Sequence, residues 1–393
     1  MKKQLTLSLL TLLLVSCGTN SESKPTEEAK PSENKVTEAE KTFEVTDLIG
    51  RTNTIKTSDK ERVLCIGAGA LRLYSYIGDI NKIIAVEDID RDVNANMFAD
   101  VSRPYYDINR EYFKTLPSCG KGGPKAQQAE AEAILNCRPT MIISEYADVL
   151  KANTLQEQVG VPVIVVKYGS KSVFDDNVNK SLTLLGKVLG EEEKSKTLND
   201  YILDCKNELS SKAATVKEEG KKSIYIGGLG NWGTQDIYST SSSFPLFEVS
   251  NIKNAVDSSI KLQNGQLEKE AFLSLNPDKI VLDSAGLKKF KTTYQTDMDA
   301  FNTMDAFKNN EIYLEMPFNA YYTNLEIALM DAYFLASVAY PEVYKDMDMD
   351  KKYDEIGTAF LGKPCYTSHV KTAKMSYGGF QKISNIKDFL TNV

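Results

Sequence analysis

The strongest constraint on the fold is a regular alternation of apolar, mostly β-branched runs with helical stretches, present in both halves of the chain. The runs that we interpret as buried strands occupy 62–69, 82–87, 140–145, 162–168, 223–228, 279–284 and 311–315. Helical patterns lie between them, and a further one at 324–340 follows the last run. Strands that alternate with helices form parallel sheets covered on both faces. The pattern therefore predicts an α/β fold with mainly parallel sheets, distributed over two lobes.

A long helix is expected to connect the lobes. An amphipathic stretch at 172–190 is followed by 191–216, which is acidic in its first turn and places Leu198, Ile202 and Leu209 on one face. At 1.5 Å per residue such a helix spans about 39 Å, enough to bridge two lobes. Alternating apolar and polar residues around a turn at 42–55 predict a hairpin or an edge strand. We therefore expect one lobe at 43–190, the connecting helix at 191–217 and a second lobe at 218–393.

One short sequence motif occurs twice in the chain, and we call it the duplicated unit. "EAILNCRPTMII" begins at Glu132 and "EAFLSLNPDKIV" begins at Glu270. In both copies we expect the Glu in the first turn of a short helix, the Leu packed inward, a Pro ending the connection and a strand after it. The unit falls at the equivalent place in each half, which indicates two lobes of similar plan.

The N-terminus has the pattern of a bacterial lipoprotein signal. Lys2 and Lys3 precede the apolar run 5–15, which is too short for a membrane span, and "LLVSCG" follows at once. We expect a signal peptide at 1–16, lipidation of Cys17, and a flexible, polar linker at 17–42. Acyl chains would then hold the mature protein on a membrane surface outside the cytoplasm.

Several functional classes are excluded or disfavoured. The net charge is −7 and no Lys/Arg cluster with aromatic residues occurs, which argues against nucleic acid as a partner. The single His369 excludes a site of several imidazoles, and the cysteines after Cys17 form no C-x-x-C pair, so we expect them to be buried small hydrophobes. "CIGAGALR" imitates a dinucleotide fingerprint, but Arg72 occupies its third small-residue position. We expect no enzyme activity and no resident cofactor.

From Phe43 onward the chain resembles the iron-complex, haem and cobalamin class of substrate-binding proteins of ABC importers (class III, TroA-like). The segments that carry the resemblance include "RVLCIGAGALRLYSYIGDINKIIAVE", "CGKGGPKAQQAEAEAIL", "IYIGGLGNWGTQDIYST" and "YLEMPFNAYYTNLEIALMDAYFLASVAYPE". The resemblance implies a monomer of two lobes, with a shallow cleft between them, that delivers its ligand to a permease and its ATPase subunits. It also implies that Glu132 and Glu270 dock into arginine pockets of the permease. Each Glu would in addition favour its helix N-terminus.

The cleft is expected at the carboxyl ends of the strands. The expected ligand-binding residues are Arg72, Arg103, Tyr105, Tyr106, Glu145, Tyr146, Trp232, Tyr321, Tyr322 and Asn324. Guanidinium groups grip carboxylate or phosphate through paired hydrogen bonds, which favours an anionic ligand. The tyrosines, expected in loops, would ligate ferric iron or stack on a planar ligand. If their segments are extended, one member of each adjacent pair packs inward.

A ferric siderophore is the first ligand that we expect from these residues. Haem is second and cobalamin third, and a ferric ion held directly by tyrosines is a further variant. A surface adhesin or sensor without a transport role remains open on the same fold, because the sequence does not separate it from an importer component.

Overall fold

Two four-stranded sheets organise the chain, one in each lobe. The first has the order β4-β3-β5-β6 and is parallel throughout; its strands are β3 (Val63–Ile66), β4 (Ile83–Ala85), β5 (Met141–Ser144) and β6 (Val163–Val165). The second has the order β12-β11-β10-β7, with β7 (Ile224–Gly227), β10 (Lys279–Asp283), β11 (Ile312–Glu315) and the antiparallel β12 (Gln381–Ile383). The two-lobed α/β fold with mainly parallel sheets is confirmed.

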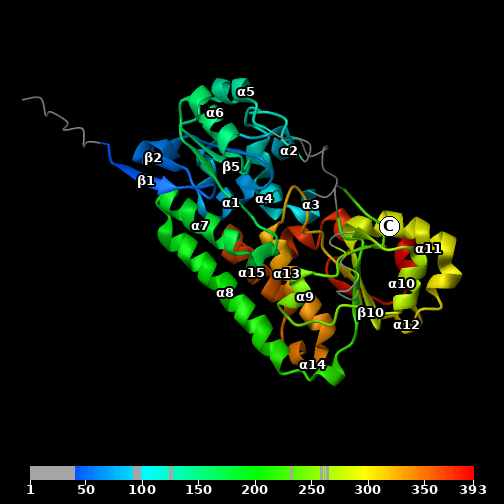
Figure 1. Cartoon of the computed structure of the whole chain (residues 1–393). Coiled ribbons are helices and arrows are strands. Elements are labelled where there is room, and N and C mark those ends of the chain that lie inside the picture. The colour runs from blue at the N-terminus through cyan, green and yellow to red at the C-terminus, as the bar shows by residue number, and fades with distance from the viewer. Residues whose placement is uncertain are drawn as a thin grey trace, which may run out of the picture. The chain divides into compact units, whose positions relative to one another are not determined.

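The structure is a computed structural model that describes residues 40–91, 99–123, 126, 128–230, 233–256, 260, 262 and 265–393. Cys17 and Trp232 lie outside these residues. Residues Glu40–Val393 form one unit by their contacts. Figure 1 shows the first lobe in blue to green and most of the second lobe in yellow to red.

Helices cover both faces of the first sheet. Along β3, Val63 and Cys65 point to one face and Leu64 and Ile66 to the other, and the two pairs belong to different hydrophobic clusters. The larger cluster includes α1 (Ala70–Ile77) and α7 (Asp176–Leu189), and the smaller includes α5 (Ala131–Cys137) and α6 (Val149–Val159). The other α-helices described in this lobe are α2 (Asp88–Arg91), α3 (Ala99–Ser102) and α4 (Pro104–Phe113).

The predicted hairpin precedes this sheet. Strands β1 (Thr42–Thr46) and β2 (Thr52–Lys56) pair antiparallel. Asp47 stabilises the turn between them, since its carboxylate accepts hydrogen bonds from the Arg51 backbone and guanidinium. Arg51 therefore has a structural role, which extends to β6 and α6 because its guanidinium also donates to the carbonyl of Val163 and to Asn153.

The connecting helix is α8 (Glu192–Ala214), and its 23 residues span about 35 Å. Leu198, Ile202 and Leu209 are buried, as the sequence pattern predicts. In Figure 1, α8 runs from beside α7 toward α14 (Pro341–Tyr344) in the second lobe. It therefore lies alongside elements of both lobes.

The second lobe is mainly helical around its sheet. Its helices are α9 (Pro245–Glu248), α10 (Lys269–Leu275), α11 (Leu287–Phe301), α12 (Asp305–Lys308), α13 (Leu325–Ala339), α14, α15 (Met349–Leu361) and α16 (Ile386–Thr391), and β8 (Ser239–Thr240) pairs with β9 (Gly265–Gln266). Helix α13 is buried on nearly all sides, as its apolar sequence requires. One hydrophobic cluster runs through residues of both lobes, so they share a core.

The duplicated unit is a helix, a turn and a strand in each lobe. Helices α5 and α10 each end in a left-handed residue, Arg138 (φ 53°) and Asn276 (φ 37°), and strands β5 and β10 follow. The prediction that its Leu packs inward is wrong for the first copy, whereas Leu273 of the second copy is partly buried against the core. Leu135 is 46% exposed, whereas Ile134 and Phe272 are fully buried. At 3.6 residues per turn, a residue two places after the exposed Glu faces the opposite side of the helix, and a residue three places after it does not.

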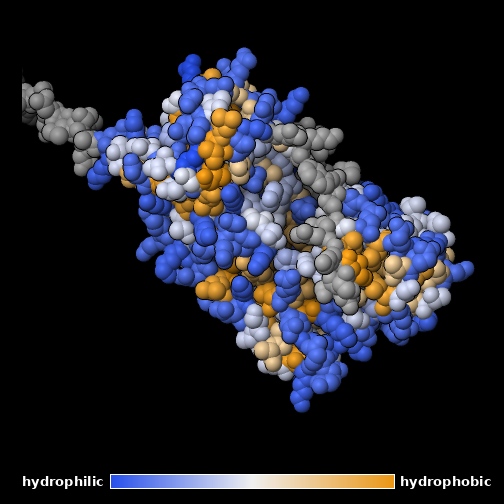
Figure 2. Space-filling model, viewed as in Figure 1, coloured by the Kyte–Doolittle hydropathy of each residue, from blue (hydrophilic) through white to orange (hydrophobic). Residues whose placement is uncertain are grey.

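The surface of the first lobe carries apolar side chains near α5 and α6. Leu135, Val149 and Leu150 are exposed, Leu150 by 76%, and Figure 2 shows hydrophobic residues in a strip over α6. Cys65, Cys119, Cys205 and Cys365 are buried and Cys137 is partly buried, and all five are free thiols. None of the helices in the described ranges combines the length and the apolar character that a membrane crossing requires.

Candidate functional site

A pocket of about 550 Å³ lies where the carboxyl ends of both sheets meet. This volume is within the range of pockets that bind small organic ligands. The first lobe contributes residues that follow β3, β5 and β6, and the second contributes residues that follow β7, β10 and β11. The cleft thus lies between the lobes, at the edge where the sequence pattern places it.

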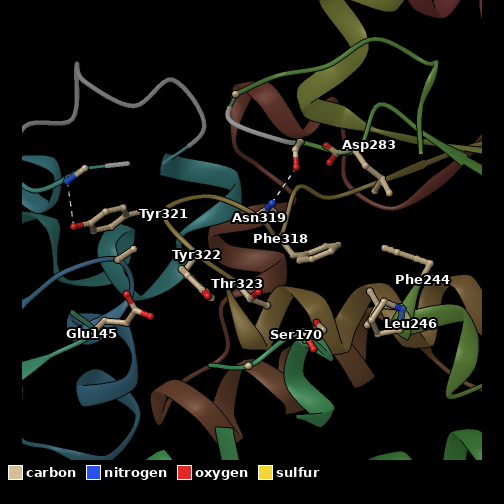
Figure 3. A pocket seen from close by; sticks show the side chains of 18 of the residues that line it. Glu145, Ser170, Phe244, Leu246, Asp283, Phe318, Asn319, Tyr321, Tyr322 and Thr323 are labelled. Atoms are coloured by element: carbon tan, nitrogen blue, oxygen red, sulfur yellow. Dashed lines mark hydrogen bonds between the residues drawn. The ribbon is translucent and has the colours of Figure 1, made fainter. Parts of the chain in front are cut away.

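The two walls of the pocket differ in character. Glu145, Tyr146 and Ser170 line it from the first lobe. The second lobe supplies an apolar wall that consists of Leu229, Phe244, Pro245, Leu246 and Phe318. Figure 3 shows Phe244, Leu246 and Phe318 on one side and Glu145 on the other, with Tyr322 between them. The pocket therefore suits a ligand with an extended apolar surface and a polar or metal-bearing part.

Among the described lining residues, two carry carboxyl groups, and both hold protons more tightly than usual. Burial raises the pKa of Glu145 to about 7 and the pKa of Asp283 to about 7. Asp283 ends β10, where it pairs in register with Glu315 of β11. Burial and the neighbouring Asp331 and Asp283 raise the pKa of Glu315 as well. Because the pKa values of Glu145 and Asp283 lie near neutral pH, ligand binding at the pocket is expected to be coupled to pH.

Tyr321 and Tyr322 both line the pocket. Their φ angles are 53° and 70°, so the segment is a left-handed turn and not an extended one, and both side chains reach the same cavity. Tyr322 is 39% exposed, and its ring lies 4.8 Å from that of Tyr168. Burial and the charge of Glu145 raise the pKa of Tyr322. The Tyr322 hydroxyl is thus a neutral phenol before any metal displaces its proton.

Arg72 and Arg103 do not line the pocket. Both are fully buried, and their N–H groups donate to protein atoms. Arg103 forms an ion pair with Asp90 and donates to the Tyr105 hydroxyl. Neither guanidinium is exposed to a ligand in this conformation. Among the described residues that line the pocket there is no Lys or Arg.

Three other predicted site residues are also buried away from the cavity. Tyr105 and Tyr106 are in α4 and not in a loop, because Pro104 at the first helical position starts a helix there. Asn324 stands at the N-cap position of α13, and its side-chain amide donates to the carbonyl of Phe318 instead of capping the helix. Of the predicted ligand-binding residues, Glu145, Tyr146, Tyr321 and Tyr322 line the pocket.

The sequence interpretation missed Asp283 and the apolar wall. Asp283 is the last residue of an apolar strand, a position that itself places a side chain at the carboxyl edge of a sheet. Phe244, Leu246 and Phe318 carry no such signal, because an apolar residue in a loop has the same pattern as core packing. No group of three or more His, Cys, Asp or Glu side chains suited to a metal ion occurs within the described residues.

Two α/β lobes with a pocket at their joined carboxyl edges define a two-lobed ligand-binding protein. The family described as "Periplasmic binding protein" matches residues 70–317, and the chain belongs to this family. It is of the TroA-like class III type, as the sequence resemblance indicates. It is therefore a solute-binding protein of an ABC transporter, from an extracytoplasmic family of transport proteins and not of enzymes.

Known proteins with similar sequence or structure support this assignment. The chain is 26% identical over 253 residues to the high-affinity heme uptake system protein IsdE of Staphylococcus aureus, covering 60% of this chain and 79% of that protein. A periplasmic solute binding protein from Veillonella parvula has a TM-score of 0.63 at 17% identity, covering 83% and 94% of the two chains. MolA of Haemophilus influenzae, solved with molybdate, has a TM-score of 0.61 at 16% identity, covering 82% and 99%. The two structures share the fold of this chain.

Proposed function

We propose that this protein is a lipid-anchored receptor that binds an iron complex, with haem as the first candidate, and delivers it to an ABC permease. The observation that carries the proposal is a pocket with one apolar wall and, facing it, a phenol and a carboxyl group. These are the hydroxyl of Tyr322 and the carboxyl of Glu145.

The apolar wall favours a planar macrocycle. Leu229, Phe244, Leu246 and Phe318 form a contact surface for the face of a haem ring, which gains free energy as apolar area leaves water. Phenolate oxygen is an established ligand of haem iron, and a carboxylate is a hard donor suited to ferric iron. The IsdE relative, named for haem uptake, agrees with this choice.

A ferric siderophore is the second candidate. Its hard oxygen donors and bulk suit the cavity, but an anionic siderophore gains no ion pair from the described lining, which has no Lys or Arg. A small oxyanion such as molybdate is disfavoured more strongly, because the carboxyl groups of Glu145 and Asp283 would oppose its charge. Haem also carries two propionate groups, so the charge of the lining does not separate it from an anionic chelate. The apolar wall, which suits the face of a macrocycle, is the reason that we rank haem first.

Titration of the soluble chain 18–393 with haemin, ferric siderophores, cobalamin, ferric citrate and molybdate tests the ligand. Saturable binding of haemin at submicromolar concentration, about −8 kcal/mol or better, supports the proposal. Tyr322→Phe should weaken haemin binding and shift the visible spectrum of the complex. Tyr377→Phe is the matched control, since Tyr377 lies outside the pocket. No binding of haemin or of any ferric siderophore would refute the proposed ligand class.

The remaining parts of the proposal concern location and delivery. Lipidation of Cys17 and the linker 17–42 would hold the protein at the membrane, and Cys17→Ser should move it from the membrane fraction to the soluble fraction. Glu132 and Glu270 are exposed in the first turns of α5 and α10, and each lobe presents one of them. Two carboxylates at equivalent positions suit a dock on a permease of two subunits.

A further inference from the structure

We infer that Arg72 is a positioning residue: its guanidinium holds the backbone of 320–323 so that Tyr321 and Tyr322 face the pocket. Arg72 lies in α1 of the first lobe, whereas the segment follows β11 of the second lobe. As far as it concerns ligand affinity, this inference rests on the proposed function. As far as it concerns the conformation of the segment, it stands independently.

Three backbone carbonyls converge on the two terminal nitrogens of Arg72. Its Nη1 donates to the carbonyl of Thr323 at 3.0 Å, and its Nη2 donates to the carbonyls of Ala320 and Tyr321, each at 2.9 Å. The planar guanidinium presents its N–H groups in a fixed fork. A lysine ammonium concentrates its donors on one atom and does not reproduce this arrangement. Arg72 thus holds four consecutive residues from the first lobe, while the side-chain amide of Asn324 donates to the carbonyls of Ala320 and Tyr322 from the second lobe.

The segment needs such support because its conformation is unfavourable. Tyr321 and Tyr322 have φ angles of 53° and 70°, the left-handed region that L residues other than glycine rarely adopt. Such a conformation persists only where surrounding contacts impose it. The carbonyls that Arg72 binds lie before, between and after the two tyrosines. Without these bonds the turn is expected to relax, and the tyrosine side chains would lose their orientation toward the cavity.

Arg72 also reaches Tyr322 through Tyr168. Arg72 Nη1 donates to the Tyr168 hydroxyl at 3.2 Å, and the ring of Tyr168 lies 4.8 Å from the ring of Tyr322. The guanidinium lies 4.9 Å from the centre of the Tyr105 ring as well. Arg72 is fully buried and does not line the pocket, so its influence on a ligand passes through these neighbours.

Hydrogen exchange in the ligand-free protein tests the positioning role directly. In Arg72→Met the amides of 318–324 should exchange at least about tenfold faster than in the wild type, while those of β5 and α8 keep their rates. Arg62→Met is the matched control, because Arg62 also donates to backbone carbonyls, those of Cys137 and Arg138, far along the chain from this segment. Unchanged exchange in 318–324 of Arg72→Met would overturn the inference.

If Arg72→Met does not fold, Arg72→Lys carries the same measurement. It keeps the buried charge and most of the stem but lacks the planar fork, so faster exchange in 318–324 is again expected. Wild-type exchange in Arg72→Lys would show that charge alone suffices, and the inference would be wrong.

A double-mutant cycle on haemin affinity tests whether Arg72 acts through Tyr322. Arg72→Met and Tyr322→Phe should each weaken haemin binding. The double variant should have about the same affinity as the single variant that loses more affinity. Additive losses would show that Arg72 acts by another route and would overturn the positioning role in binding. Absence of haemin binding in the wild type would instead refute the proposed ligand, and hydrogen exchange would still decide what Arg72 does.

Discussion

The hydroxyl of Tyr321 donates a 2.5 Å hydrogen bond to Oε2 of Glu87. Glu87 follows β4 in the first lobe, and its other carboxyl oxygen accepts the backbone N–H of Gly67 at 3.1 Å. The bond therefore connects the pocket segment after β11 to the carboxyl edge of the first sheet. Gly67, which belongs to the segment "CIGAGALR" that imitates a dinucleotide fingerprint, thus has a structural contact with Glu87.

Tyr321→Phe should lower the free energy of unfolding by about 1–3 kcal/mol, because it removes a hydrogen-bond donor from a buried carboxyl group. Burial already raises the pKa of Glu87, and the bond from Tyr321 lowers it again. Urea unfolding at neutral pH measures the change. Tyr322→Phe is the control and should cost less, since Tyr322 is 39% exposed. Equal losses in the two variants would contradict this role of Glu87.

Arg103→Ala should destabilise the fold and not act on the ligand directly. The Arg103 guanidinium is fully buried against the carboxylate of Asp90, which is 3% exposed. Removing one partner of a buried pair leaves an uncompensated charge and costs about 3–5 kcal/mol. The double variant Asp90→Ala/Arg103→Ala should recover part of this loss in urea unfolding. A stable Arg103→Ala protein with weakened ligand binding would instead restore the anion-binding interpretation.

Stability should fall as pH rises from about 4 to about 7 through the Asp283 carboxyl. Burial raises its pKa to about 7 in the folded protein, against about 4 in the unfolded chain, so the folded state retains the proton over this window. The contribution of Asp283 to the free energy of unfolding is complete below about pH 4 and is lost as the pH rises through about 7. Each pKa unit corresponds to about 1.4 kcal/mol.

Thermal unfolding across this pH range, compared between wild type and Asp283→Asn, measures that contribution. The asparagine variant should lose less stability than the wild type between pH 4 and pH 7. Asp204→Asn, an exposed position on α8, is the control and should follow the wild type. Identical pH profiles for the wild type and Asp283→Asn would show that the buried carboxyl is not linked to folding.

Charge reversal of the two surface glutamates should separate transport from binding. Glu132→Lys/Glu270→Lys is expected to abolish uptake in cells, and each single variant to reduce it, while ligand affinity in solution stays at the wild-type value. Both residues are exposed and outside the pocket. Glu157→Lys, an exposed position on α6, controls for the added charge. Normal uptake by the double variant would refute the docking role.

The helices and strands lie close to where the sequence pattern predicts them, whereas only some of the predicted site residues line the pocket. The periodicity that predicts β3, β5, β10, α8 and α13 is a local property, and the structure confirms each of them. The arginines show the opposite case. The sequence gives the charge of Arg72 and Arg103 but not the carbonyl and carboxylate groups that accept their hydrogen bonds. These acceptors lie in other elements, such as the segment after β11 for Arg72 and helix α2 for Arg103.

The sequence by itself determined the two-lobed α/β plan, the repeated unit and the edge at which a cleft must lie. These depend on hydrophobic periodicity and on the direction of parallel strands, which neighbouring residues set. Only the tertiary structure decided that Tyr321 and Tyr322 face the pocket while Arg72 supports them from beneath. These different roles of the tyrosines and of Arg72 depend on a left-handed turn at 321–322, which Arg72 holds from about 250 positions away. No local sequence pattern encodes such a contact.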